Sequence, residues 1–168
     1  MKRLYLLSLV LMTSILTYAQ SPLGDEGNQF SLASGYTTAG IPVVASYEMG
    51  VYPNISFGIE ASYRMFSEST DTATFDHNIA GLSFFGNYYF NEMLNMDEKM
   101  GLYAGINFSY YKWFSPDDYL ALGKSSSTFA VGAQLGYRYY FGSFGLYIEG
   151  VGSTDHVGGK FGLTYRLD

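Results

Sequence analysis

Cysteine, charge and long apolar runs are what this sequence lacks or holds little of. It has no cysteine, which excludes a lipid-anchored lipoprotein, a disulfide scaffold and a thiol enzyme. Charged residues make up 14% of the chain, against about 25% in soluble domains. Beyond the N-terminal segment no apolar run approaches the ~18 residues of a membrane-spanning helix, so none is predicted.

The N-terminus has the pattern of a secretory signal. Lys2 and Arg3 precede an apolar run over residues 4–16, and Thr17-Tyr18-Ala19 places small residues before a cleavage point. This predicts a cleaved signal peptide over residues 1–19 and one domain over residues 20–168. The alternative is a membrane anchor, but the run is shorter than the ~20 residues that span a bilayer, so cleavage is favoured.

The remaining chain is aromatic, glycine-containing and acidic. Aromatic residues form 18% of the sequence, and there are 20 glycines. This composition, without long apolar runs, is typical of a membrane β-barrel. Cleavage leaves seven basic and fifteen acidic residues, a net charge of −8. A nucleic-acid partner is therefore excluded, because a phosphate backbone requires a basic surface.

Eight segments alternate apolar with polar or small residues. In the clearest one, Ile55, Phe57 and Ile59 alternate with Ser56, Gly58 and Glu60. Alternation with period two predicts strands with one apolar face. Eight is the smallest strand number of single-chain bacterial barrels, so the sequence predicts an all-β, eight-stranded antiparallel up-and-down transmembrane β-barrel. The segments are 30–36, 43–51, 55–65, 78–90, 100–113, 129–141, 144–151 and 160–167.

Aromatic residues recur where several strands are expected to end on the periplasmic side. Rings prefer the interface between apolar core and water, which predicts a periplasmic aromatic girdle of Tyr88, Phe90, Tyr139, Phe141 and Tyr165. Segments 52–54 and 142–143 are predicted periplasmic turns, and 91–98 is a long connection for that side. The predicted outer loops are 37–40, 67–74, 114–126 and 153–156.

Charged residues fall on the faces of the strands that are expected to point inward. An eight-stranded barrel has a lumen barely wide enough for side chains, and unpaired buried charges are costly. We therefore predict an ion-pair network that fills the lumen, and favour this plug over a narrow conducting path or a proton relay. The predicted network comprises Glu48, Glu60, Arg64, Arg138, Glu149, Lys160 and Arg166.

Candidate chemistry is sparse, and neither a catalytic residue nor a metal or cofactor is predicted. His77 and His156 are the only histidines. The Ser153–His156 segment with Asp155 is interpreted as a polar turn. Asp117-Asp118 lacks the ligand spacing of a cation site. The outer loops carry an acidic excess that could hold divalent cations bridging to lipopolysaccharide phosphates or contact a basic partner, or that is simply a soluble surface. Its residues are Glu68, Asp71, Asp117, Asp118 and Asp155, against Lys124.

The strand pattern resembles the small eight-stranded outer-membrane barrels of the OmpA/OmpX type in Gram-negative bacteria. In that family the last strand carries an insertion signal, whose positions Lys160, Gly162, Tyr165 and Leu167 occupy here, with Leu167 in place of the usual aromatic residue. The resemblance implies location in the outer membrane, surroundings of lipid and lipopolysaccharide, and insertion by the barrel-assembly machinery.

The sequence leaves several functions open, because one barrel hosts many activities. The first hypothesis is a non-enzymatic membrane scaffold or a barrel that binds through its loops. The alternatives are a small channel and a barrel subunit of an envelope or secretion complex, while a lipid hydrolase comes last. The sequence names no specific ligand or envelope partner.

Overall fold

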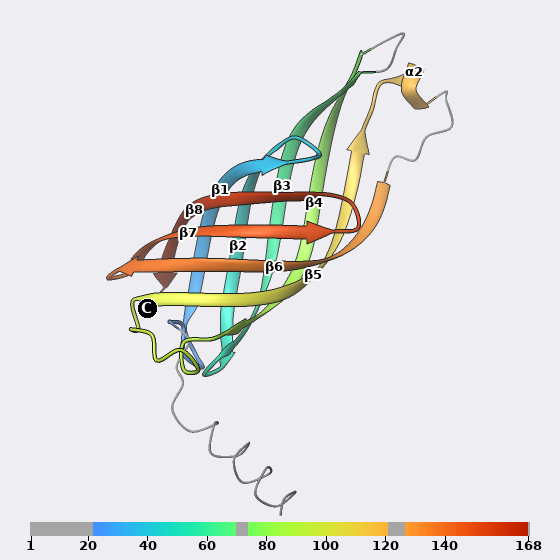
Figure 1. The fold of residues 1–168 in the computed structure, drawn as a ribbon. Coiled ribbons are helices and arrows are strands. Elements are labelled where there is room, and N and C mark those ends of the chain that lie inside the picture. The colour runs from blue at the N-terminus through green and yellow to red at the C-terminus, as the bar shows by residue number, and fades with distance from the viewer. Residues whose placement is uncertain (1–21, 70–73, 121–126, 168) are drawn as a thin grey trace, which may run out of the picture.

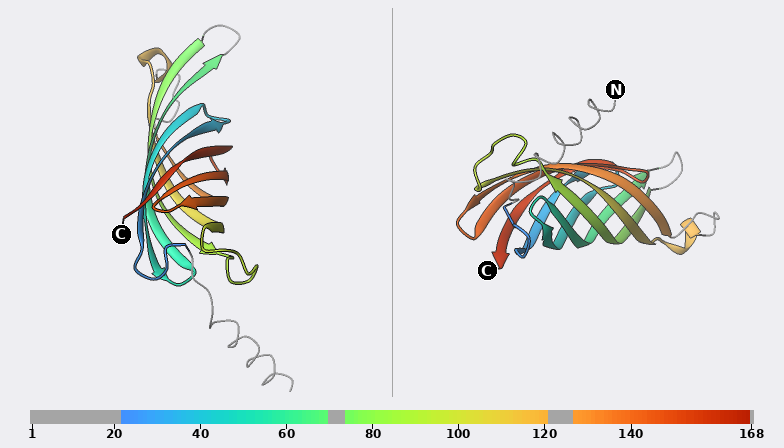
Figure 2. Two further views of the ribbon diagram at one scale, coloured as in Figure 1. Left: turned by 90° about the vertical axis from the view of Figure 1, so that its left-hand side faces the viewer. Right: turned by 90° about the horizontal axis from the view of Figure 1, so that it is seen from below.

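The computed structural model describes residues 22–69, 74–120 and 127–167. Within them the chain forms one closed barrel of eight antiparallel strands, each paired with its sequence neighbours, and β1 with β8 closes the ring (Figures 1 and 2). The predicted fold class is therefore confirmed. The predicted signal peptide, and the predicted loop residues Asp71 and Lys124, lie outside the described residues.

The strands differ in length around the ring. Those of the middle of the chain run to 15 or 16 residues, whereas the first and the last two have only 10 or 11. The strands are β1 Asn28–Thr37, β2 Ile41–Tyr52, β3 Ile55–Ser69, β4 Thr74–Tyr89, β5 Met100–Phe114, β6 Ser127–Phe141, β7 Phe144–Ser153 and β8 Val157–Leu167, with a short helix α2 at Asp117–Leu120.

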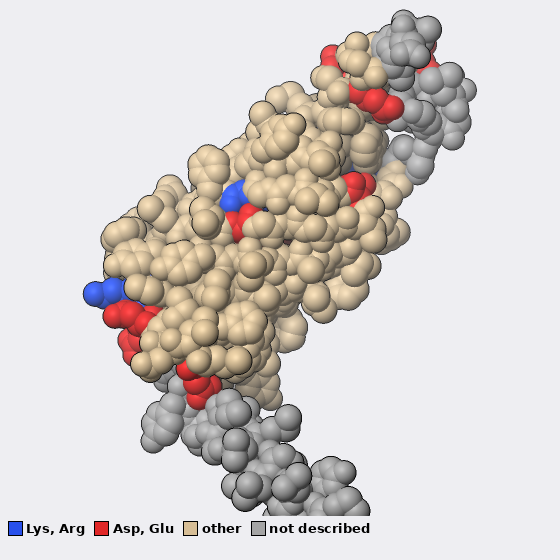
Figure 3. All heavy atoms as spheres, in the orientation of Figure 1, with Lys and Arg blue, Asp and Glu red and all other residues tan. Residues whose placement is uncertain are grey.

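The two faces of the wall have the reverse of a soluble protein's polarity. Outward residues such as Phe57, Ile59 and Phe84 are about half exposed, whereas inward Glu48, Gln29 and Ser56 are buried. In Figure 3 the visible wall is mostly free of charged atoms; apart from a small group near its middle, they lie toward its two ends. An apolar exterior around a polar interior is the arrangement that a bilayer requires of a strand-built membrane protein.

The longer strands form a tall wall at one end of the barrel. We call this the loop end, and the opposite end, where β1 begins and β8 finishes, the terminal end (Figure 1). The prediction of a loop over 67–74 was too wide, because Ser67, Glu68 and Ser69 pair with Asp76, Phe75 and Thr74. Beyond a membrane both faces of a strand are wet, so alternation disappears while backbone pairing continues.

Two of the three connections at the terminal end are tight. Pro53 and Asn54 join β2 to β3, and Gly142 with Ser143 joins β6 to β7, where Gly142 has a φ of 70°. Such a backbone favours glycine. The third connection, 91–98, is long, as predicted. In the described part of the chain, no helix is long and apolar enough to cross a membrane.

Candidate functional site: the barrel lumen

A buried carboxylate and guanidinium form the hub of the lumen near the terminal end. Glu48 on β2 and Arg138 on β6 are 1% and 3% exposed, and their side chains meet at 2.5 Å. Each points inward because it lies between outward apolar neighbours. A buried charge pair is tolerable only when its remaining hydrogen-bonding atoms are satisfied.

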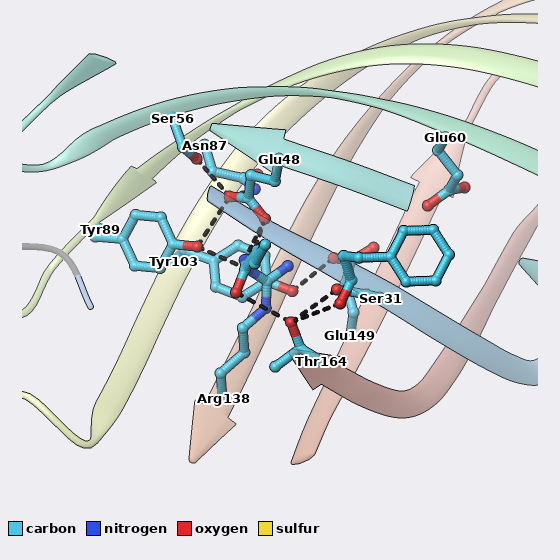
Figure 4. A network of polar contacts seen from close by, with 12 residues as sticks. Ser31, Glu48, Ser56, Glu60, Asn87, Tyr89, Tyr103, Arg138, Glu149 and Thr164 are labelled. Atoms are coloured by element: carbon cyan, nitrogen blue, oxygen red, sulfur yellow. Dashed lines mark hydrogen bonds and ion pairs between the residues drawn. The ribbon is translucent and has the colours of Figure 1, made fainter. Parts of the chain in front are cut away.

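Three further strands supply those hydrogen bonds to Glu48 (Figure 4). The Gln29 amide donates at 2.7 Å, the Asn87 amide at 3.0 Å and the Tyr89 hydroxyl at 2.9 Å. The Ser56 hydroxyl also donates to Glu48. The partners come from β1, β3, β4 and, with Arg138, β6, so the hub connects strands across the lumen rather than only along one ladder.

Tyrosine rings enclose Arg138. Its guanidinium lies 4.6 Å from the ring centroid of Tyr103 and 5.2 Å from that of Tyr147, and it donates to the Tyr89 hydroxyl at 2.9 Å. Cation–π contacts of this kind strengthen when water is excluded. The Tyr103 ring has room because it lies against Gly136, where a Cβ atom would overlap it.

A second charged cluster adjoins this hub toward the loop end. Lys160 on β8 contacts Glu60 on β3, and its Nζ lies 3.0 Å from Glu149 Oε1 on β7. The Tyr103 hydroxyl donates to Glu149 at 2.7 Å. Tyr103 therefore joins the two clusters, since its ring also faces Arg138.

A third cluster closes the lumen at the loop end. Arg64 on β3 donates to Asp155 at 3.3 Å and stacks 4.4 Å from the centroid of the Tyr111 ring. Asp155 lies 3.2 Å from His156 Nδ1 in the turn between β7 and β8. The His156 contact and the Arg64 charge hold the pKa of Asp155 below its ordinary value, although partial burial opposes this. The Ser153 hydroxyl accepts from the backbone of both Asp155 and His156, which makes this segment a hydrogen-bonded polar turn.

The seven predicted network residues are thus distributed among separate groups, and Arg166 lies apart from the others. Its guanidinium donates to the backbone carbonyls of Pro22 at 3.0 Å and Gly142 at 2.7 Å, and it stacks on Tyr140. The prediction included Arg166 in the ion-pair network of the lumen, but its place at the end of β8 puts it at the mouth. Asp155, which the sequence placed in an outer loop, instead provides the carboxylate nearest Arg64.

An N-terminal turn, residues 22–27, crosses the mouth at the terminal end. The Gly50 amide donates to Gly27 at 2.9 Å, and Leu23 is buried. A Cβ atom on Gly50 would meet Leu23 and the Gly24 carbonyl, and one on Gly101 would meet Pro22. These two glycines on β2 and β5 therefore make room for the turn, which the alternation pattern did not predict.

A small polar cavity remains in the loop-end half of the lumen. Its volume is about 40 Å³, enough for a few ordered waters. Ser83 and Ser109 are 2.8 Å apart on its wall, beside Asn107 and Gln134. The cavity lies among Arg64, Lys160 and Glu60, so it separates the second cluster from the third.

The predicted girdle residues lie at the terminal end, in separate groups at the ends of β4, β6 and β8. Tyr88 contacts Phe90 with ring centroids 5.2 Å apart, and Tyr139 contacts Phe141 at 4.9 Å. Tyr165 pairs instead with Phe144 at 4.8 Å, a residue that the sequence assigned to the start of a strand. Of the insertion-signal positions, Tyr165 and Leu167 face outward and Lys160 faces the lumen.

Strand pairing at the tall wall brings together a serine, a histidine and a carboxylate that sequence reasoning missed. His77 Nδ1 lies 2.9 Å from Ser115 Oγ, and His77 Nε2 lies 3.9 Å from Glu68. The second distance is too long for a hydrogen bond. Phe66 and Trp113 pack against the buried imidazole. We interpret these residues as a packed group that stabilises the pairing of β3, β4 and β5. Only the pairing register of the strands could have revealed that they lie close together.

Comparison with protein-family models finds no match, and no curated protein matches the sequence either. Solved structures do match. OprG from Pseudomonas aeruginosa has a TM-score of 0.61 at 11% identity, covering 88% of this chain and 99% of its own. Neisserial surface protein A has a TM-score of 0.57 at 12% identity, covering 86% and 97%.

A third structural neighbour is Ail of Yersinia pestis, solved with the heparin analogue sucrose octasulfate. Its TM-score is 0.52 at 15% identity, covering 85% of this chain and 99% of its own. Identities this low establish a shared fold and not a shared activity. The chain therefore has the fold of the small eight-stranded outer-membrane barrels, as its resemblance to the OmpA/OmpX type predicts.

Proposed function

We propose that the protein is a non-enzymatic integral barrel of the outer membrane of a Gram-negative bacterium, exported through a cleaved signal peptide over residues 1–19. Its lumen is filled and does not conduct, and it acts as a membrane scaffold or through its loops. The apolar outer face of the strands and the fold of its structural neighbours support the location.

The observation that best supports a non-conducting lumen is the Glu48–Arg138 hub. A permeating ion would have to separate a pair that is buried, 2.5 Å apart and hydrogen-bonded to several strands. Breaking a buried pair costs several kcal/mol. The N-terminal turn lies beyond the hub on the same side, so it adds a second obstruction.

Conductance of the refolded barrel in a planar bilayer tests this function. A heat-dependent shift in gel mobility first shows that the barrel is folded. We expect a folded barrel without stable openings. Steady, ion-selective openings would replace the scaffold with the second candidate, a small channel, which the polar cavity at the loop end favours.

We propose that the barrel is surrounded by outer-membrane phospholipid and lipopolysaccharide. We also propose that the barrel-assembly machinery inserts it into the membrane. Lys160, Gly162, Tyr165 and Leu167 occupy the positions of the insertion signal. Replacing both Tyr165 and Leu167 with alanine should lower the amount of barrel in outer-membrane fractions. An unchanged amount would show that these positions do not form the signal.

The loop end favours cationic over polyanionic ligands. Its described charged residues outside the lumen are Glu68, Asp76, Asp117 and Asp118, against Lys112. The sucrose octasulfate bound by Ail is a polyanion, which an acidic rim repels. We therefore propose that divalent cations, bridging to lipopolysaccharide phosphates, or a basic partner contact this rim.

A further inference from the structure

The connection between β4 and β5 at the terminal end has an ordered structure that barrel closure does not require. The backbone amides of Leu94, Asn95 and Met96 donate to the carbonyls of Phe90, Glu92 and Asn91 at 2.9–3.1 Å. Asn95 ends this turn with a φ of 49°. The Asp97 carboxylate then accepts from the Lys99 amide at 2.8 Å. The two neighbouring connections at this end are completed by tight turns of two residues.

This hydrogen-bonded turn presents two large apolar side chains to the surroundings. Met93 is 62% exposed and Leu94 55% exposed, although neither lies on a strand of the apolar wall. The two side chains are adjacent in the chain and lie outside the wall that faces lipid, so together they form a small apolar tip that a partner could cover. A preformed turn also lowers the entropy lost on binding.

The charges around this tip are mainly acidic. The described acidic residues of the terminal end, outside the lumen, are Asp25, Glu26, Glu92, Asp97 and Glu98. They outnumber the basic residues Lys99 and Arg166, and Arg166 is engaged with Pro22 and Gly142. Figure 3 shows red atoms predominating at this end of the barrel.

We propose that the Met93–Leu94 turn is a docking element for a basic periplasmic protein, which receives the apolar tip in a pocket rimmed by Lys or Arg. The proposal rests on the proposed outer-membrane location, which makes the terminal end periplasmic. It gives the chain a place as the barrel subunit of an envelope assembly.

Other occupants of the tip fit the structure less well. A phospholipid surface attracts turns with basic rather than acidic flanks. A second copy of this chain in a symmetric dimer would bring two acidic ends together.

Site-specific photo-crosslinking in the native bacterium tests the proposal. A photoreactive amino acid replaces Leu94, and the matched control replaces Tyr52, which is 64% exposed at the same end. We expect one discrete protein adduct from position 94 and none from position 52. Introducing Glu26→Lys and Glu98→Lys should reduce that adduct at least about tenfold, because like charges across an interface repel. Glu98→Gln should reduce it less.

The captured protein is then purified and titrated against the barrel. We expect Met93→Ser with Leu94→Ser to weaken binding at least about tenfold, as removal of a central apolar anchor does. Added salt should also weaken binding, because the rim charges are screened. No adduct, equal adducts at both positions, or an adduct indifferent to the charge reversals would overturn the proposal.

A fluorescence experiment tests whether the tip contacts the lipid surface instead of a protein partner. Because the chain has no cysteine, Leu94→Cys can be labelled alone with a polarity-sensitive dye, and the barrel placed in phospholipid nanodiscs. We expect the emission of a water-exposed dye; a blue shift equal to that of a label at Leu146 on the apolar wall would overturn the proposal. Heat-shifted mobility and outer-membrane fractionation of each variant report separately whether the proposed location holds.

Discussion

At the scale of single residues, the Glu48–Arg138 pair has the greatest consequence for stability. Glu48→Ala leaves Arg138 buried at 3% exposure without its carboxylate. We expect this variant to lose about 3–5 kcal/mol of unfolding free energy. Urea titration in lipid vesicles, followed by the fluorescence of Trp113, the only tryptophan, measures the loss.

The matched control replaces both partners with apolar side chains of similar volume, as Glu48→Leu with Arg138→Met. This double variant should recover part of the loss, because it leaves no buried unpaired charge. Recovery is incomplete because the Gln29, Asn87 and Tyr89 donors lose the acceptor that Glu48 provides. If Glu48→Ala is as stable as the wild type, the pair does not hold the strands together.

Asp155 predicts a pH dependence of stability. Its pKa is lowered in the folded barrel by the His156 contact and the Arg64 charge, so its stabilisation is complete above the unfolded pKa of about 3.9. It disappears as the pH falls through the lower folded value. Wild type should exceed Asp155→Asn by roughly 1 kcal/mol at pH 7. This difference should vanish in strong acid, while a constant difference across acidic pH would contradict the assignment.

Among the elements, the N-terminal turn over residues 22–27 depends on Arg166 at the other end of the chain. Arg166 holds the Pro22 carbonyl at 3.0 Å, and Leu23 is buried at the mouth. A cysteine at position 23 should therefore react slowly with a soluble maleimide. Adding Arg166→Ala should accelerate labelling at least about tenfold, since about 1.5–3 kcal/mol of hydrogen bonding to a charged group is lost.

The control for this experiment is a cysteine at the exposed Asp25, whose labelling should be fast with or without Arg166. If position 23 reacts as fast as position 25 in the wild type, the turn does not cover the mouth. The gel shift of each variant shows whether the barrel itself stays folded.

At the scale of elements, the strand ends show which parts of the strands can be predicted from apolar–polar alternation. All eight strands were predicted, because alternation reports which residues face an apolar surface. The outer ends of β3 and β4 were not, because Ser67, Glu68 and Asp76 carry no such alternation. The N-terminal turn had no sequence signal either, since it depends on space left by Gly50 and Gly101 on distant strands.

At the scale of the whole molecule, the filled lumen predicts that the barrel will conduct ions once the side chains that fill it are removed. Replacing Glu48, Arg138 and Tyr103 with alanine removes the hub and the ring beside it, and Arg166→Ala loosens the turn beyond. We expect this fourfold variant to conduct where the wild type does not. The combination Phe57→Ala, Ile59→Ala and Phe84→Ala changes only the outer face and should remain silent. If the fourfold variant folds but shows no conductance, another part of the lumen forms the seal.

The strand number, the polarity of the two faces and the identity of most charged residues inside the barrel follow from the sequence alone. These are local properties, because a strand's period of two assigns each side chain to a face without reference to its neighbours. Which charges meet depends on the folded barrel: Glu48 with Arg138, Lys160 with Glu60 and Glu149, Arg64 with Asp155, and Arg166 with the N-terminal turn. Those partners come from different strands, and only the ring's register and closure set the distances between them.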